Sequence, residues 1–264
     1  MPSLAEINPA DEPIKLLMLG HSGVGKTGAI ASLASAGYRV FLADFENGYQ
    51  ILMDEKVLPK AHRGNVFVRS FYDKRMGPLA LPVGGVPKAM QNFYDALSSW
   101  KDAVDGKTVN LGNPYTWTQQ DVLVIDSITT LSDAIELHVL QINNRIGQPL
   151  RIQDYGTCQE ILHGLFQTLC SPAATCNVVF IAHLRQLEDG SGGNKWFPQA
   201  TGKKISPLIG RYFNNSVLLT RDAQGNREMH TQSTIQADMK VSRPSVIPAK
   251  MPADLGRLFK LLKS

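Results

Sequence analysis

One stretch, "GHSGVGKT" at residues 20–27, constrains the fold of this 264-residue chain more than any other feature. It fits the pattern G-x-x-x-x-G-K-[ST] in full, and that pattern joins a strand to a helix. The apolar run "IKLLMLG" (14–20) precedes it, and "KTGAIASLASAG" (26–37) follows with helix-forming residues and a terminal glycine. The next apolar run is "YRVFLAD" (38–44). Residues 14–44 therefore have the spacing of a βαβ unit, which predicts an α/β fold.

The residue types in this stretch suit the binding of phosphate. Gly20, Gly23 and Gly25 let backbone N–H groups turn toward phosphate oxygens with no side chain in the way, and the start of the helix adds positive partial charge. Lys26 is expected to place a cation on the β- and γ-phosphates, and the Thr27 hydroxyl to ligate Mg²⁺. We therefore predict that this loop binds ATP with Mg²⁺. The predicted nucleotide-binding residues are Gly20, His21, Ser22, Gly23, Val24, Gly25, Lys26, Thr27 and Gly28.

The rest of the chain alternates apolar runs with amphipathic stretches. Strands are expected at 65–71, 121–126, 177–183 and 215–221. Helices are expected at 88–104, 132–146 and 155–170. The stretches 72–88 and 187–204 are rich in Gly and Pro or in Gly, and we expect loops there. This order predicts a doubly wound fold with a mostly parallel central sheet flanked by helices, as one domain over 14–264 preceded by a short arm over 1–13.

Composition and charge indicate the kind of partner and the cellular compartment to expect. The net charge is +4, but residues 203–264 hold eleven Lys/Arg and four Asp/Glu, a balance of +7 that hints at a polyanionic partner. The three cysteines, Cys158, Cys170 and Cys176, form no metal-binding pattern, which is typical of a reduced intracellular chain. No apolar run reaches the length of a membrane span, and the N-terminus has no secretion signal pattern. We therefore expect a cytoplasmic protein with no membrane partner.

A carboxylate follows the apolar run "VLVI" in "DVLVIDSITT" (121–130). Asp126 would lie at the carboxyl end of a central strand beside the phosphate loop, where it can hold Mg²⁺ through water. The alternative is a helix cap, because Asp126 or Ser127 could begin the helix that follows.

A second acidic position, Glu46 in "VFLADFENGYQ" (40–50), is the candidate for activating water. Many phosphate-loop proteins place that carboxylate directly after the Mg²⁺ aspartate, but here Asp126 is followed by Ser127. Asp44 and Glu46 bracket the end of the strand that follows the phosphate-loop helix. We expect that strand to lie close to the nucleotide strand, so that Glu46 can orient water against the γ-phosphate. The alternative is a solvated glutamate at a strand end.

Four segments together resemble the RecA-like recombinase core: "GHSGVGKT", "FLADFENG", "VLVIDSITTL" and "VVFIAHLRQ". The resemblance implies that Glu46 is the catalytic glutamate and Asp126 the Mg²⁺ aspartate. It also implies that His183 lies at the position of a sensor for the γ-phosphate, where bacterial recombinases commonly have Asn-Gln. A buried structural histidine is the alternative for His183. The short chain looks most similar to phage-encoded RecA-core ATPases associated with single-strand annealing recombination, which would work in the bacterial host cytoplasm.

The segment after the sensor matches the second DNA-binding loop of that family. Lys195 can contact phosphate, and Trp196 and Phe197 can stack on unpaired bases. The alternatives are a plain surface loop or a lid whose Trp packs on its own domain. Lys203 and Lys204 match the place of a lysine that reaches the neighbouring subunit's nucleotide in RecA-like assemblies. The alternative is a solvated basic patch, and Arg211 and Arg221 are further candidates for the role.

Two arginines, Arg145 and Arg151, lie where the first DNA-binding loop of the family would fall, in "NNRIGQPLRIQDYG" (143–156). The resemblance thus predicts an ATP-hydrolysing protein that binds single-stranded DNA, is stimulated by it, and acts in phage recombination, annealing or replication. It would assemble as a ring or filament with nucleotide at subunit interfaces, and could work with a phage single-strand DNA-binding or annealing protein. The alternatives are a nucleotide-gated interaction module, such as a helicase loader or clamp, and a small-molecule kinase. The absence of Arg from 187–204 counts against the kinase.

Overall fold

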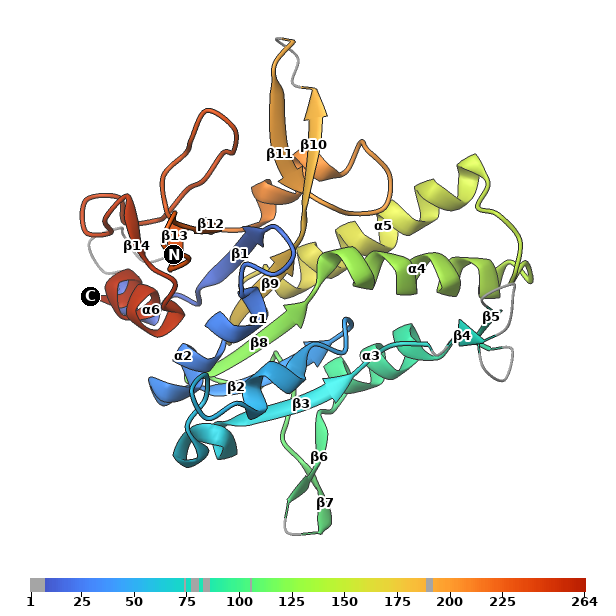
Figure 1. Ribbon diagram of the computed structural model, residues 1–264. Helices are drawn as coiled ribbons and strands as arrows, with labels where there is room; N and C mark the ends of the chain where they lie inside the picture. Colours follow the sequence, from blue (N-terminus) through green and yellow to red (C-terminus); the bar gives the residue numbers. More distant parts are fainter. Residues whose placement is uncertain (1–7, 74, 77–80, 83–85, 105, 189–191) are drawn as a thin grey trace.

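An eight-stranded sheet forms the centre of the computed structural model, which describes residues 8–73, 75–76, 81–82, 86–104, 106–188 and 192–264 (Figure 1). Its strand order is β14-β13-β12-β1-β9-β8-β2-β3. The strands are β1 Lys15–Gly20, β2 Arg39–Asp44, β3 Val66–Ser70, β8 Asp121–Asp126, β9 Asn177–Ala182, β12 Asn215–Arg221, β13 Arg227–His230 and β14 Lys250–Pro252. All neighbours from β12 to β3 pair in parallel, and only β13 and β14 join antiparallel. The predicted mostly parallel sheet is confirmed.

Helices cover both faces of the sheet. On one face lie α1 Lys26–Ala29, α2 Ala31–Ser35 and α6 Leu255–Lys263, and on the other α3 Ala89–Ser98, α4 Ile128–Ile142 and α5 Ile152–Leu169. The described part of the chain also contains four short 3₁₀ helices: η2 Pro9–Asp11 before β1, and η3 Tyr49–Met53, η4 Lys60–Asn65 and η5 Ser206–Tyr212 in the connections.

Alternation along the strands builds the two cores. Leu16 and Met18 pack with α1, α2 and α6, whereas Leu17 and Leu19 pack with α3, α4 and α5. Successive side chains of a strand point to opposite faces, so a continuous apolar run is what a strand covered on both sides requires.

The strand order corrects one expectation. We expected β2 to lie close to β1, but β9 and β8 lie between them. The pairing of β2 with β8 nevertheless sets Asp44 opposite Asp126 in register. The loop after β2 therefore leaves the sheet at the edge where Asp126 lies.

The predicted helix 88–104 was too long. It ends at Ser98, because Ser99 is extended, and β6 Lys101–Val104 then pairs antiparallel with β7 Lys107–Asn110. Trp100, which fitted the helical spacing, is fully buried beyond the helix end. The dipeptide Asp-Gly at 105–106 is a hairpin signal that could have placed this boundary.

Two stretches predicted to be loops contain hairpins. The stretch 187–204 holds β11 Asn194–Pro198 and the end of β10 Leu184–Glu188; the two strands pair antiparallel, and the hairpin projects from the body of the molecule (Figure 1). In 72–88, β4 Arg75–Met76 pairs with β5 Leu81–Pro82. The glycines at 190, 192 and 193 favour a turn as well as a loop. A short polar sequence with glycine between two strand-forming segments is a hairpin pattern, so the sequence carried a signal for the β10–β11 hairpin.

Two further predictions concern the N-terminal arm and the absence of a membrane span. Of the predicted arm over 1–13, residues 1–7 lie outside the described part, and η2 occupies three of the rest. Among the residues that the structure describes, none of the helices is both long enough and apolar enough to cross a bilayer.

Candidate active site

The phosphate loop connects the carboxyl end of β1 to the start of α1. Gly23 and Gly25 have φ of 76° and 95°, a left-handed conformation that favours glycine. Gly20 is needed for a different reason: a Cβ there would lie 2.8 Å from Val24 Cγ2 and 3.1 Å from the carbonyl oxygen of Leu219. The loop can close tightly over the sheet edge only with glycine at these positions.

Lys26 lies inside the loop and is buried. Its Nζ donates to the carbonyl oxygens of Gly20, at 3.0 Å, and His21, at 2.9 Å. Burial lowers the pKa of Lys26, while the carboxylates of Glu46 and Asp126 act in the opposite direction. The ammonium is thus held at the centre of the loop, where a phosphate oxygen would be its natural acceptor.

Asp126 and Thr27 meet beside this lysine. The Thr27 hydroxyl donates to Asp126 Oδ2 at 2.6 Å, and Asp126 Oδ1 is buried with no hydrogen-bond partner among the described residues. Burial raises the pKa of Asp126 to about 7, with the Thr27 hydrogen bond opposing it. A buried, unpaired carboxylate oxygen next to a hydroxyl is the oxygen donor set that Mg²⁺ takes, so Thr27 and Asp126 fit this ion.

The helix cap, which was the alternative role for Asp126, is provided by the next residue in the chain. Ser127 is the N-cap of α4, and its Oγ accepts a hydrogen bond from the backbone N–H of Thr130. The peptide bond between Asp126 and Ser127 is cis.

Glu46 points into the site from the loop after β2. Its Oε1 accepts hydrogen bonds from His183 Nε2, at 2.8 Å, and from the Ser127 hydroxyl. Burial pushes the pKa of Glu46 up, but the hydrogen bonds from His183 and Ser127 and the charge of Lys26 outweigh it, and the pKa lies below its usual value. Glu46 is therefore an oriented carboxylate anion and not a freely solvated side chain.

The turn that carries Glu46 is ordered by Asp44. The Asp44 carboxylate accepts backbone N–H groups from Glu46 at 3.0 Å, Gly48 at 3.2 Å and Tyr49 at 3.4 Å. Such contacts between an Asp side chain and the following backbone are the usual way to stabilise a tight turn. Asp44 therefore supports the site without pointing into it.

His183 joins the two charged groups. Its Nε2 contacts Glu46, and its Nδ1 lies 3.3 Å from Lys26 Nζ. Because an ammonium can only donate, Nδ1 is the acceptor and the proton is assigned to Nε2, which donates to Glu46. Ser127, Glu46, His183 and Lys26 thus form one continuous hydrogen-bonded chain across the sheet edge.

The predicted DNA-contacting residues of the second loop lie on β11. Lys195 makes an ion pair with Asp238 at 3.2 Å. Trp196 is half-buried against the core, and its ring meets that of His21 edge-on with centroids 4.7 Å apart. Phe197 is also half-buried. The hairpin therefore touches the phosphate loop directly through Trp196.

Four of the other predicted cations make none of the contacts found for Glu46 in the described part of the chain. Lys203 and Lys204 are exposed, and the hydrogen bonds and ion pairs found in the described part of the chain include neither side chain. Arg145 makes an ion pair with Asp154 at 2.5 Å, and Arg151 is the exposed N-cap residue of α5. The connection between α4 and α5 that holds both lies at the far end of α4 from Asp126 (Figure 1).

Sequence reasoning missed two groups at the site. Ser127 was considered only as a cap, although its hydroxyl also orients Glu46. Arg227 was not considered, and its guanidinium lies against Gly25 and Gly28. Neither position carries a local signal, because each side chain arrives from an element distant in sequence.

A comparison with family models finds a match over most of the chain. A family model described as an AAA domain matches residues 12–251. Among solved structures, the chain is similar to an ATPase from the type III secretion system of pathogenic bacteria, with 14% identity and a TM-score of 0.43. That match covers 79% of this chain and 51% of the other, so this chain spans about half the length of that protein. No curated protein gives a significant match.

Proposed function

This chain belongs to the AAA-domain family, and on that basis we propose that it binds ATP and hydrolyses its terminal phosphoanhydride bond. The observation that carries the proposal is the hydrogen-bonded chain Ser127–Glu46–His183–Lys26 beside the Thr27–Asp126 pair. One set of groups suits phosphate and Mg²⁺, and the other presents an oriented carboxylate next to it. A protein that only held a nucleotide would need the first set alone.

Each residue has a distinct role in this proposal. The loop backbone and Lys26 bind the β- and γ-phosphates, and Thr27 and Asp126 would hold Mg²⁺. When bound, the ion neutralises charge that develops on the phosphate oxygens.

The role of Glu46 is to orient the attacking water and to accept its proton. Both contacts found for its carboxylate go to Oε1, so Oε2 is the atom that can accept a proton from water. His183 is a positioning residue, because it fixes the orientation of Glu46 and touches Lys26 at the same time. A bound γ-phosphate that draws Lys26 Nζ toward itself would therefore change the contact between Lys26 and His183.

The test is turnover of ATP by the purified chain with Mg²⁺, read as phosphate release. Lys26→Ala is expected to abolish nucleotide binding, whereas Lys101→Ala, an exposed lysine on β6, is the control for loss of a positive charge. Wild-type protein that neither binds nor hydrolyses a nucleoside triphosphate would refute the proposal.

We further propose that single-stranded DNA stimulates this activity, in a ring or filament that serves phage recombination, annealing or replication. Three observations support this. The β10–β11 hairpin begins directly after His183 and touches the phosphate loop through Trp196. Lys203 and Lys204 are exposed, as a contact to a neighbouring subunit or to phosphate would require. The last 62 residues, 203–264, carry the excess of positive charge.

Turnover with and without single-stranded DNA tests this part. We expect stimulation and salt-dependent binding, since contacts to phosphate release counterions. Lys203→Ala with Lys204→Ala is expected to weaken DNA binding or to remove the stimulation. Lys107→Ala, on the β6–β7 hairpin at the opposite side of the molecule, is the matched control (Figure 1). Turnover that is equal with and without single-stranded DNA, together with no DNA binding, would refute this part of the proposal.

A further inference from the structure

Two arginines from the β12–β13 hairpin lie against the phosphate loop. Arg221 and Arg227 are opposite each other in the antiparallel pair. Arg221 Nη2 donates to the carbonyl oxygen of Gly23 at 2.8 Å. A Cβ built on Gly25 would lie 2.5 Å from Arg227 Nε, and one on Gly28 would lie 3.0 Å from Arg227 Nη1. The guanidinium of Arg227 thus occupies the space that these two glycines leave free.

In the described part of the chain, neither arginine of this pair makes an ion pair with a carboxylate. Like charges directly opposite in an antiparallel pair are destabilising. An anion bound beside Gly25 and Gly28 would supply the negative partner that Arg227 lacks among the described ion pairs.

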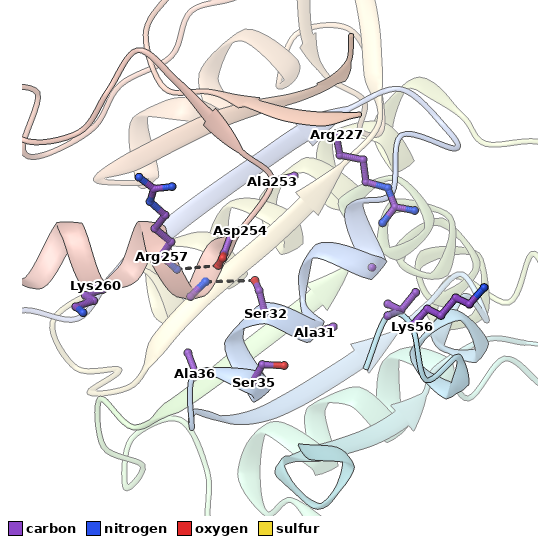
Figure 2. A pocket seen from close by; sticks show the side chains of 13 residues that line it. Ala31, Ser32, Ser35, Ala36, Lys56, Arg227, Ala253, Asp254, Arg257 and Lys260 are labelled. Carbon is purple, nitrogen blue, oxygen red and sulfur yellow. Dashed lines mark hydrogen bonds between the residues drawn. The ribbon is translucent and has the colours of Figure 1, made fainter. Parts of the chain in front are cut away.

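A cavity of about 620 Å³ opens at the same place (Figure 2). It runs from Gly28 and Arg227 between α1–α2 and α6, and four cations line it: Lys56, Arg227, Arg257 and Lys260. Among the described residues that line it, the one carboxylate is that of Asp254, which caps α6 by accepting the backbone N–H of Arg257 at 2.8 Å. The cavity therefore favours an anionic ligand that reaches it from the phosphate loop.

We propose that Arg227 binds the α- and β-phosphates of a nucleoside di- or triphosphate from within the same subunit. Arg221 holds the loop in place through Gly23, and the phosphates of the ligand lie at the end of the cavity formed by Gly28 and Arg227. This inference rests on the proposed function, because it requires that the loop binds a nucleotide. It adds a cation that acts in cis and on the part of the ligand that ADP and ATP share.

The experiment is calorimetric titration of Mg²⁺–ADP and Mg²⁺–ATP into wild-type protein and Arg227→Met, which keeps an unbranched apolar side chain and removes the guanidinium charge. We expect Kd to rise about tenfold or more for both nucleotides, the effect of losing a hydrogen bond between charged groups. Arg211→Met is the control. Arg211 is exposed and lies on η5, before the amino end of β12, whereas the phosphate loop follows the carboxyl end of the parallel strand β1.

A second measurement separates binding from a structural role. Thermal unfolding without nucleotide should show an unchanged or higher Tm for Arg227→Met, because the change breaks none of the ion pairs found among the described residues. A lower Tm combined with unchanged Kd would overturn the inference and make Arg227 a structural residue.

The outcomes distinguish this inference from the proposed function. If wild-type protein binds ADP and ATP and Arg227→Met binds both as tightly, the inference fails and the proposed function stands. A loss confined to ATP also overturns it, since the contact would then be to the γ-phosphate. If wild-type protein binds neither nucleotide, both fail.

Discussion

Replacement of Glu46 by Gln is the sharpest test of the site. The Gln side chain has the same shape, and its Oε1 can still accept from His183 Nε2 and the Ser127 hydroxyl, the two contacts that orient Glu46. The change falls on the other atom. Oε2, an acceptor for the proton of water, becomes an amide NH₂ that can only donate.

The expected magnitude follows from this geometry. Loss of a positioned general base lowers kcat by about 10²- to 10⁴-fold, which is ~3–5 kcal/mol of barrier. Nucleotide affinity should be unchanged or higher, because Lys26, Thr27 and Asp126 are untouched and a negative charge near the phosphates is removed.

The assay is steady-state phosphate release together with an independent titration of ATP. Glu55→Gln is the matched control: Glu55 is exposed, makes an ion pair with Lys60 at 2.6 Å, and should show wild-type turnover. His183→Gln should lower kcat less than Glu46→Gln, because it removes the orientation of the base and leaves the base itself.

Turnover above roughly a tenth of the wild-type rate in Glu46→Gln would refute the reasoning, since a general base contributes about 10²-fold or more. Glu46 would then only hold His183 and Ser127 together. Loss of ATP binding in the same variant would point to the same conclusion, because the phosphate-binding groups would then depend on that anchor.

Other parts of the structure give further predictions. Asp126→Asn should reduce the gain in ATP affinity that Mg²⁺ provides, and equal Mg²⁺ dependence in variant and wild type would contradict the assigned role. Gly256→Ala should cost about 1–3 kcal/mol in urea unfolding, because its Cβ would lie 2.6 Å from the carbonyl oxygen of Ser32, whereas Gly164→Ala has open space and should not destabilise. Burial raises the pKa of Cys170 to about 12, so its alkylation should be slow at pH 8 and rise about tenfold per pH unit toward that pKa, and fast labelling of the native protein at pH 8 would refute this.

Local sequence patterns determined the layered fold and one half of the site. The phosphate loop is contiguous in the chain, and its glycines, Lys26 and Thr27 have roles that follow from backbone geometry at neighbouring positions. The apolar runs of β1, β8 and β9 predicted strands covered on both faces, and the position of Asp126 at the end of such a run placed it at the sheet edge of the loop. Periodicity was less informative at helix ends, as Trp100 shows, because a buried aromatic satisfies a helical pattern without being in the helix.

Only the tertiary structure decided the other half. Glu46 meets His183 across 137 positions of sequence, and Lys26 meets His183 across 157. Those contacts depend on the strand order, which places β8 and β9 between β2 and β1, and strand order is a property of long-range pairing that no local propensity encodes. The same holds for Arg227, whose position against Gly25 and Gly28 follows from the pairing of β13 with β12 and of β12 with β1. The sequence alone thus determined where a phosphate can bind, and the fold decided which side chains surround it.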